Sequence, residues 1–134
     1  MLFLRRSLAV AAVVCFCALG THAQNHARYH DIKRSWKDPE LEYTALVEAN
    51  RKAAAIRCQE HYILAKIVSD DWEVMANEDG NIVGRYLHME LYGETRDGKC
   101  GVSHCVFKQR RMGDETYARL RIVELGEFYD MECE

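Results

Sequence analysis

The chain has 134 residues, of which 49% are hydrophobic and 29% charged, and its formal net charge is −3 at pH 7. This composition is ordinary for a globular protein and excludes a disordered, collagen-like or repeat-array chain. The length allows a single small domain and excludes a two-domain enzyme.

Residues 1–23 have the pattern of a secretory signal peptide. Arg5 and Arg6 precede an apolar run from Leu8 to Leu19, and the small residue Ala23 stands at the expected cleavage position. The run is shorter than the roughly 20 apolar residues of a membrane helix, so a retained anchor is the less favoured alternative. We therefore expect a secreted, extracellular protein with no membrane contact after cleavage.

Cleavage would leave 111 residues and change the formal charge from −3 to −5, because two arginines and no acid are removed. A nucleic-acid-binding protein needs its cations concentrated on one face. The densest basic cluster, Lys108–Arg111, lies between two strand-like segments and is expected to be a solvated turn. Nucleic acid is therefore not an expected partner.

Four of the six cysteines would remain after cleavage, and an even number in a small exported chain indicates two disulfides. Three pairings are possible. The short spacing favours Cys100 with Cys105, which leaves Cys58 with Cys133 to attach the C-terminus to an early element. The sequence does not decide among the three pairings.

A helix is expected after a flexible N-terminal arm, residues 24–37, which shows no hydrophobic period. Asp38 and Pro39 are a helix N-cap and a first helical residue, so a domain is expected over residues 38–134 and a helix over Pro39–Arg57. The helical period predicts that Leu46, Ala49, Ala53 and Ile56 face the core, with Glu48, Arg51 and Lys52 outside.

Beyond the helix the period changes to two, which indicates strands over His61–Met75, from Ile82 onward, over Gly101–Lys108 and over Thr116–Leu125. Turns are expected at residues 77–81, 96–99 and 112–115. The alternation places Val83, Leu87, Met89 and Leu91 on the core face of their strand, and Tyr86, His88, Glu90 and Tyr92 on the wet face. One helix followed by such strands predicts a two-layer α+β domain.

Several segments resemble the cystatin family. The plant members carry L-A-R-F-A-V-x-E-H-N in their helix. Leu41–Asn50 keeps its leucine, second alanine, glutamate and asparagine, and has an aliphatic residue at a fifth position, Leu46. Tyr86–Leu91 resembles the strand after the family's first hairpin loop, and Cys105–Lys108 resembles the strand before its second loop. The resemblance covers Pro39–Leu125 and implies one helix packed on a curved antiparallel sheet of four to five strands.

The resemblance also implies inhibition of papain-like cysteine peptidases by a wedge that enters the active-site cleft. The wedge consists of a glycine near the N-terminus, a Q-x-V-x-G first loop and a Pro-Trp second loop. Two parts have no match here, because residues 24–79 contain no glycine and residues 110–114 contain neither proline nor tryptophan. The first loop has an altered counterpart in Asn81–Gly84.

The resemblance identifies candidate peptidase-binding residues in both loops. Two carboxylates at the expected tip, Glu78 and Asp79, would have to be desolvated in a cleft, which argues against ordinary tight inhibition. A non-inhibitory protein that binds another extracellular partner is therefore the alternative. The candidate residues are Asn81, Ile82, Val83, Gly84 and Trp72 for the first hairpin, and Arg110, Arg111, Met112 and Gly113 for the second loop. For Trp72 the favoured alternative is that it covers the sheet or packs near the loop base, and for Val83 and Gly84 the alternative is that they begin a strand.

Two further kinds of site, a cysteine nucleophile and a zinc site, are suggested by cysteines and histidines of the sequence. Cys105 beside His104 suggests a nucleophile, and the same two residues with Cys100 and His88 suggest a zinc site. Adjacent strand residues point to opposite faces, however, and exported cysteines are usually oxidised. We therefore expect no catalytic residue, no metal and no cofactor, and an enzyme of the related helix-on-sheet type is the least favoured function.

Overall fold

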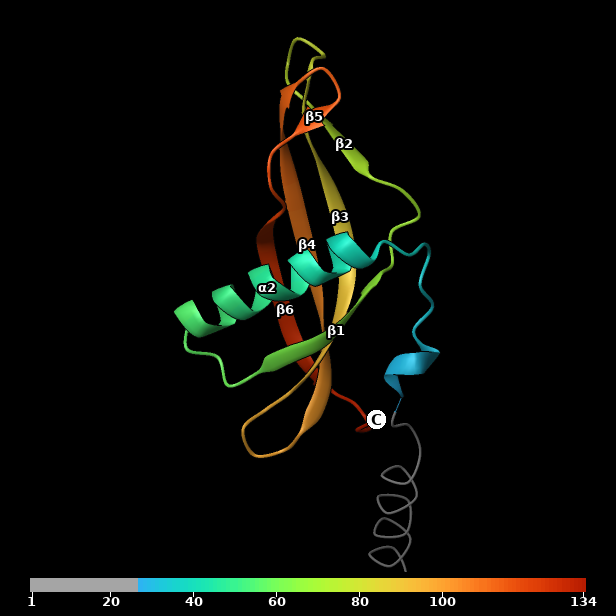
Figure 1. Cartoon of the computed structure of the whole chain (residues 1–134), viewed down its shortest axis with the longest axis vertical. Coiled ribbons are helices and arrows are strands. Elements are labelled where there is room, and N and C mark those ends of the chain that lie inside the picture. The colour runs from blue at the N-terminus through green and yellow to red at the C-terminus, as the bar shows by residue number, and fades with distance from the viewer. Residues whose placement is uncertain (1–26) are drawn as a thin grey trace, which may run out of the picture.

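A computed structural model describes residues 27–134, so the expected signal peptide lies outside the described residues. One helix, α2 (Pro39–Ala55), packs on one face of a curled antiparallel sheet that forms a half-barrel (Figure 1). This α+β layout is the expected one, with six strands in place of four or five. The strands are β1 (His61–Ile67), β2 (Glu73–Ala76), β3 (Ile82–Glu94), β4 (Cys100–Gly113), β5 (Thr116–Tyr117) and β6 (Arg121–Asp130), and a 3-10 turn, η1 (Tyr29–Asp31), precedes the helix. Among the residues described, no helix combines the length and hydrophobicity needed to cross a bilayer.

Strands β3 and β4 form the centre of the sheet, and both β1 and β2 pair with the outer edge of β3. The single strand expected over residues 61–75 is therefore split. At the break, the N–H groups of Val68 and Ser69 both point at the carbonyl oxygen of His88, at 3.1 and 3.4 Å. The Ser69 hydroxyl accepts the His88 N–H at 2.7 Å. The Ser69 side chain thus replaces a backbone acceptor in the pairing with β3, and the chain leaves the sheet between β1 and β2.

The helix begins where the sequence predicts. The Asp38 carboxylate accepts the N–H of Leu41 at 3.1 Å, and Pro39 is the first helical residue. The helix ends at Ala55, two residues early, and Arg57 follows in the left-handed region at φ 60°. The sheet-facing side is lined by small side chains that let the helix lie close to the strands: Ala45, Ala49 and Ala53, each at most 1% exposed.

Two predicted helix positions are wrong. Glu48, expected outside, is 1% exposed, and Ile56, expected in the core, is 52% exposed. The Glu48 carboxylate accepts hydrogen bonds from Arg51 at 3.1 Å and from the N–H of Ile122 at 3.5 Å. Burial acts to raise the pKa of Glu48, but these bonds and the nearby arginine charges outweigh it and lower the pKa. Glu48 therefore joins α2 to β6 as a carboxylate.

Replacing Glu48 with alanine should lower the free energy of unfolding by about 1–3 kcal/mol, because the Ile122 N–H loses its acceptor. Because the folded pKa lies below the unfolded one, the charge of Glu48 stabilises the fold at neutral pH, and this stabilisation is lost as the pH falls below about 4.5. Glu48→Gln removes only the charge. Urea unfolding should show that the difference in unfolding free energy between wild type and Glu48→Gln is present at pH 7 and becomes smaller as the pH is lowered. Exposed Glu78→Gln is the control, and an equal effect there would contradict the assignment.

The N-terminal arm packs against the sheet, although the sequence predicts a flexible segment. Tyr29 is 3% exposed, and its ring lies 5.3 Å from that of Tyr92. The Lys66 ammonium lies 4.3 Å from the Tyr29 ring centroid. Further along, the Ser35 N–H donates to the carbonyl of Ile67 at 2.9 Å. Tyr92, expected on the wet face, is consequently 1% exposed.

The favoured disulfide pairing is wrong. Cys100 is bonded to Cys133, with 5.1 Å between their Cα atoms, and Cys58 and Cys105 are free thiols. Cys100 and Cys105 stand five residues apart on the same strand, about 17 Å, whereas a disulfide needs Cα atoms within about 7 Å. Cys105 is fully buried in the core beneath α2.

Thiol alkylation should report this connectivity. For the mature chain, residues 24–134, we expect intact mass spectrometry to show two adducts when the protein is denatured without reduction, and two more after reduction. In the native protein half-buried Cys58 should react before buried Cys105. Four protected cysteines before reduction would contradict the single bond.

Candidate protein-binding site

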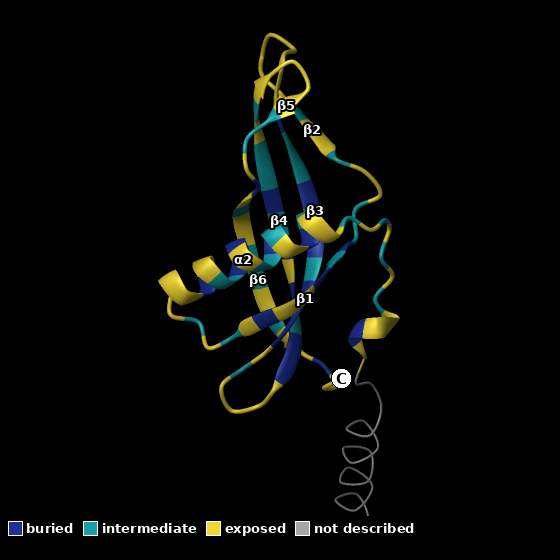
Figure 2. Cartoon of the chain, viewed as in Figure 1, coloured by how far each residue is buried: buried dark blue, intermediate teal, exposed yellow. Residues whose placement is uncertain are grey.

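The two hairpin tips lie together at one end of the sheet (Figure 1). The β2–β3 loop is closed by a hydrogen bond from the Asn77 N–H to the Asn81 carbonyl at 2.9 Å, and Gly80 adopts a φ of 81°. The β4–β5 turn at residues 114–115 stands beside it. Residues of both tips are exposed (Figure 2). The turns therefore occur where the sequence predicts them and are accessible to a partner.

Arg111 holds the two tips together. Its guanidinium donates to the Gly113 carbonyl at 3.0 Å and to the Asp114 carboxylate at 3.2 Å, both in its own hairpin. It also donates to the carbonyl of Ile82, in the other hairpin, at 3.5 Å. The sequence suggests Arg111 as a partner-binding residue, but the structure uses its side chain to position the tips.

A shallow groove of about 520 Å³ runs between the tips. Three apolar side chains are exposed there, with Ile82 and Val83 each 38% and Met112 59% accessible. Apolar side chains brought together at an exposed rim are typical of protein-binding surfaces. The groove lining unites most candidates of both loops: Asn81, Ile82, Val83, Arg110, Arg111, Met112, Gly113 and Asp114.

Trp72 does not lie among the groove residues. Its ring packs against the core and covers the guanidinium of Arg85 at 3.9 Å, and Tyr117 covers the same guanidinium at 3.8 Å. Arg85 also donates to the Gln109 side chain at 2.9 Å. This stack joins β3 and β5 to the residue that immediately precedes β2. The sequence gives no sign of it, because the three residues come from separate segments.

Gly84, another candidate, is buried on β3, where it pairs with Arg110 of β4. A Cβ atom at this position would lie 2.8 Å from the Gln109 carbonyl oxygen, which is backbone and cannot rotate away. Gly84 therefore allows the close approach of the two strands, and it is buried, unlike Ile82 and Val83.

Gly84→Ala should force β3 and β4 apart and cost about 1–3 kcal/mol of unfolding free energy, in the range of overpacked sites. Gly113→Ala is the matched control, since a Cβ there meets nothing within 4 Å. Urea unfolding of both variants measures the difference. Equal stability of the two variants would contradict the close-approach role.

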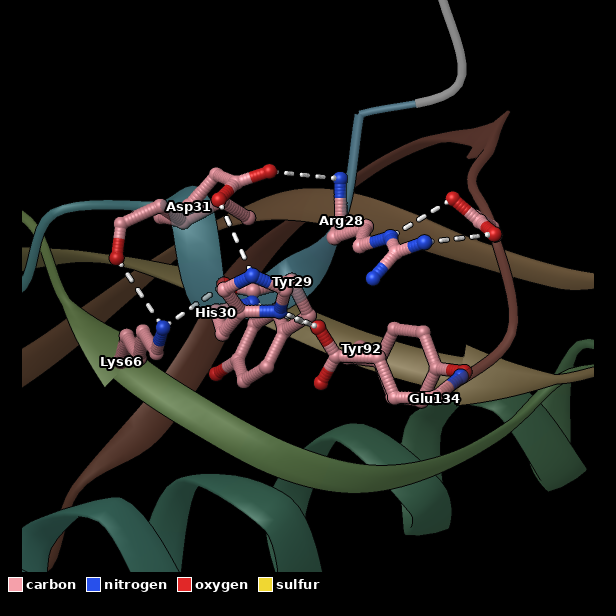
Figure 3. Close-up of polar contacts among 9 residues, drawn as sticks. Arg28, Tyr29, His30, Asp31, Lys66, Tyr92 and Glu134 are labelled. Atoms are coloured by element: carbon pink, nitrogen blue, oxygen red, sulfur yellow. Dashed lines mark hydrogen bonds and ion pairs between the residues drawn. The ribbon is translucent and has the colours of Figure 1, made fainter.

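The N-terminal arm lies at the other end of the sheet from the tips (Figure 1), beside the C-terminal tail (Figure 3). The Tyr29 hydroxyl donates to the Glu90 carbonyl at 3.3 Å, and Arg28 donates to the Glu132 carboxylate at 2.8 and 3.1 Å. The His30 N–H donates to the Glu134 carboxylate at 2.6 Å. Glu90 and Ile82 are eight residues apart on β3, or about 27 Å.

The four residues weighed for zinc do not assemble. Cys100 is in the disulfide and Cys105 is in the core, on the opposite side of β4 from His104. His88 and His104 do meet, with 2.9 Å between Nδ1 and Nε2. Over residues 27–134 no group of three or more potential ligands is placed to hold a metal.

Comparisons of the chain with protein-family models, with curated proteins and with solved structures find no match. The family relationship implied by the sequence is therefore not shown.

Proposed function

We propose that this protein acts by binding another protein through the paired hairpin tips, and that its target is the active-site cleft of a papain-like cysteine peptidase. The observation that carries the proposal is the bridge of Arg111 between the two hairpins. Together with the β3–β4 ladder, which reaches the Gly84–Arg110 pair, this bridge places the exposed apolar residues of both loops along one groove. The choice of target rests on the cystatin resemblance of the sequence.

Preformed tips suit this role. Turn hydrogen bonds and Arg111 already fix both loops, so binding would lose less conformational entropy than it would with free loops. Burial of Ile82, Val83 and Met112 would supply apolar contact. Such a wedge inhibits by occupying the cleft without presenting a scissile bond to the nucleophile.

A non-inhibitory extracellular binding protein is the second candidate, favoured by the position of the N-terminal arm. If the chain is cut after Ala23, only residues 24–26 precede the docked arm, and three residues span about 10 Å. The tips lie about 27 Å along β3 from the arm's contact at Glu90. A three-part wedge would then lack its N-terminal part.

The described thiols support binding over catalysis. Cys58 and His61 line one surface depression of about 600 Å³. Burial and the neighbouring Glu60 carboxylate raise the pKa of Cys58, and burial raises the pKa of Cys105 to about 12. Both thiols therefore stay protonated at pH 7 and are poor nucleophiles.

Titration of papain and of a cathepsin with the mature protein tests the proposal. We expect loss of peptidase activity at micromolar concentrations or below. Full activity of both enzymes at that concentration would overturn the inhibitor function and leave the non-inhibitory candidate.

Val83→Asp and Met112→Asp should each raise the inhibition constant at least about tenfold, because a carboxylate would be buried in place of an apolar side chain. Ile63→Asp is the matched control, since Ile63 is 43% exposed on β1, outside the groove. Unchanged inhibition by the Val83 and Met112 variants would show that the groove does not bind the peptidase.

A further inference from the structure

Basic side chains from two segments meet beside the hairpin end. Lys108 and Arg110 come from β4, and Arg119 and Arg121 come from the chain that enters β6. The segments are joined by a hydrogen bond from the Ala118 N–H to the Arg110 carbonyl at 2.8 Å. These four cations and Ala118 line a depression of about 380 Å³, and no acid is among its lining residues. We call these five residues the basic depression.

The charges of the basic depression are poorly compensated within the fold. Lys108 and Arg121 are directly opposite each other in the β4–β6 ladder, and like charges in this position destabilise a sheet. Arg121 reaches the Glu48 carboxylate at 3.6 Å. Within residues 27–134, Lys108, Arg110 and Arg119 form no ion pair with an acid. This concentration of positive charge occurs in a chain whose net charge is negative.

The expectation of a solvated turn over residues 108–111 is wrong, because these residues continue β4. Alternation along the strand places Lys108 and Arg110 on one face, about 7 Å apart. Arg121 stands about 5 Å from Lys108 across the ladder. Backbone pairing thus holds the Cα atoms of these residues close together, so that their charged groups can reach neighbouring anionic groups of one polymer.

We propose that the basic depression binds a sulfated polysaccharide of the heparan sulfate class. Single-stranded nucleic acid needs free aromatic rings on which bases stack, and Tyr117, next to Ala118, has a ring covered by Arg85. A membrane surface needs apolar side chains beside the cations, and Ala118 is the sole apolar lining residue. A sulfated chain needs only the cations.

The binding site adjoins the hairpin groove without depending on it. Arg110 lines both depressions, so a bound polysaccharide would lie beside the tips. Lys108 and Arg119 line the basic depression and not the hairpin groove. Their substitution therefore tests the polysaccharide site while leaving the proposed peptidase-binding residues intact.

Binding of the mature protein to heparin, measured in 0.05–0.3 M NaCl, tests the proposal. We expect Lys108→Gln/Arg119→Gln to bind about five- to tenfold more weakly at 0.15 M NaCl. Its dependence of log Kd on log salt should be shallower by about two, because two fewer counterions are released. The matched control is Lys52→Gln/Arg96→Gln, which removes the same charge from exposed positions outside the basic depression.

The proposal would be overturned if wild type did not bind heparin at 0.15 M NaCl, or if the control variant lost as much affinity as the double variant. It would also be overturned if desulfated heparin bound as tightly as heparin. Tighter binding of single-stranded DNA or of anionic vesicles than of heparin would overturn it as well. The single variants Lys108→Gln and Arg119→Gln serve if the double variant does not fold. Peptidase inhibition by the double variant should equal that of wild type, so loss of one function is distinguishable from loss of the other.

Discussion

The pairing of β3 with β4 is the constraint on which the other parts of the structure depend. The ladder runs without a register shift from Gly84 and Arg110 to Glu94 and Cys100. Its core face supplies Leu87, Met89, Leu91, Cys105 and Phe107 to the cluster beneath α2. One end of the ladder carries the hairpin tips, and residues 28–30 of the N-terminal arm and the C-terminal tail pack near the other end. The length of the ladder therefore sets the separation between the surface proposed for partners and the end that is closed by the disulfide.

The sequence predicts those features that depend on neighbouring residues. The Asp38–Pro39 start of the helix and the turns at Gly80 and Gly98 follow from local backbone and capping chemistry, and the structure confirms them. The buried Glu48 and the split between β1 and β2 do not follow, because each depends on a partner far along the chain. Burial of Glu48 depends on the hydrogen bond from the Ile122 N–H, and the split depends on the hydrogen bond from the His88 N–H to the Ser69 hydroxyl.

The candidate site shows the same division. The sequence identifies both loops, yet Arg111 bridges the two tips and Gly84 lets β3 and β4 approach closely. Both roles arise only once the hairpins stand side by side. The Cys100–Cys105 pairing, by contrast, was excludable from the sequence, since both residues lie in one predicted extended segment or at its start. Close spacing along a strand keeps cysteines apart, whereas in a loop it can bring them together.

The opposite placement of the tail and the tips determines how the molecule can be attached to something else. Glu134 is held next to Tyr92 by its own backbone N–H, which donates to the tyrosine hydroxyl at 3.0 Å. A bead, a label or a fused domain joined after Glu134 would therefore lie at the end of the molecule opposite the hairpin tips. A protein immobilised in this way would present Ile82, Val83 and Met112 outward, free of the support.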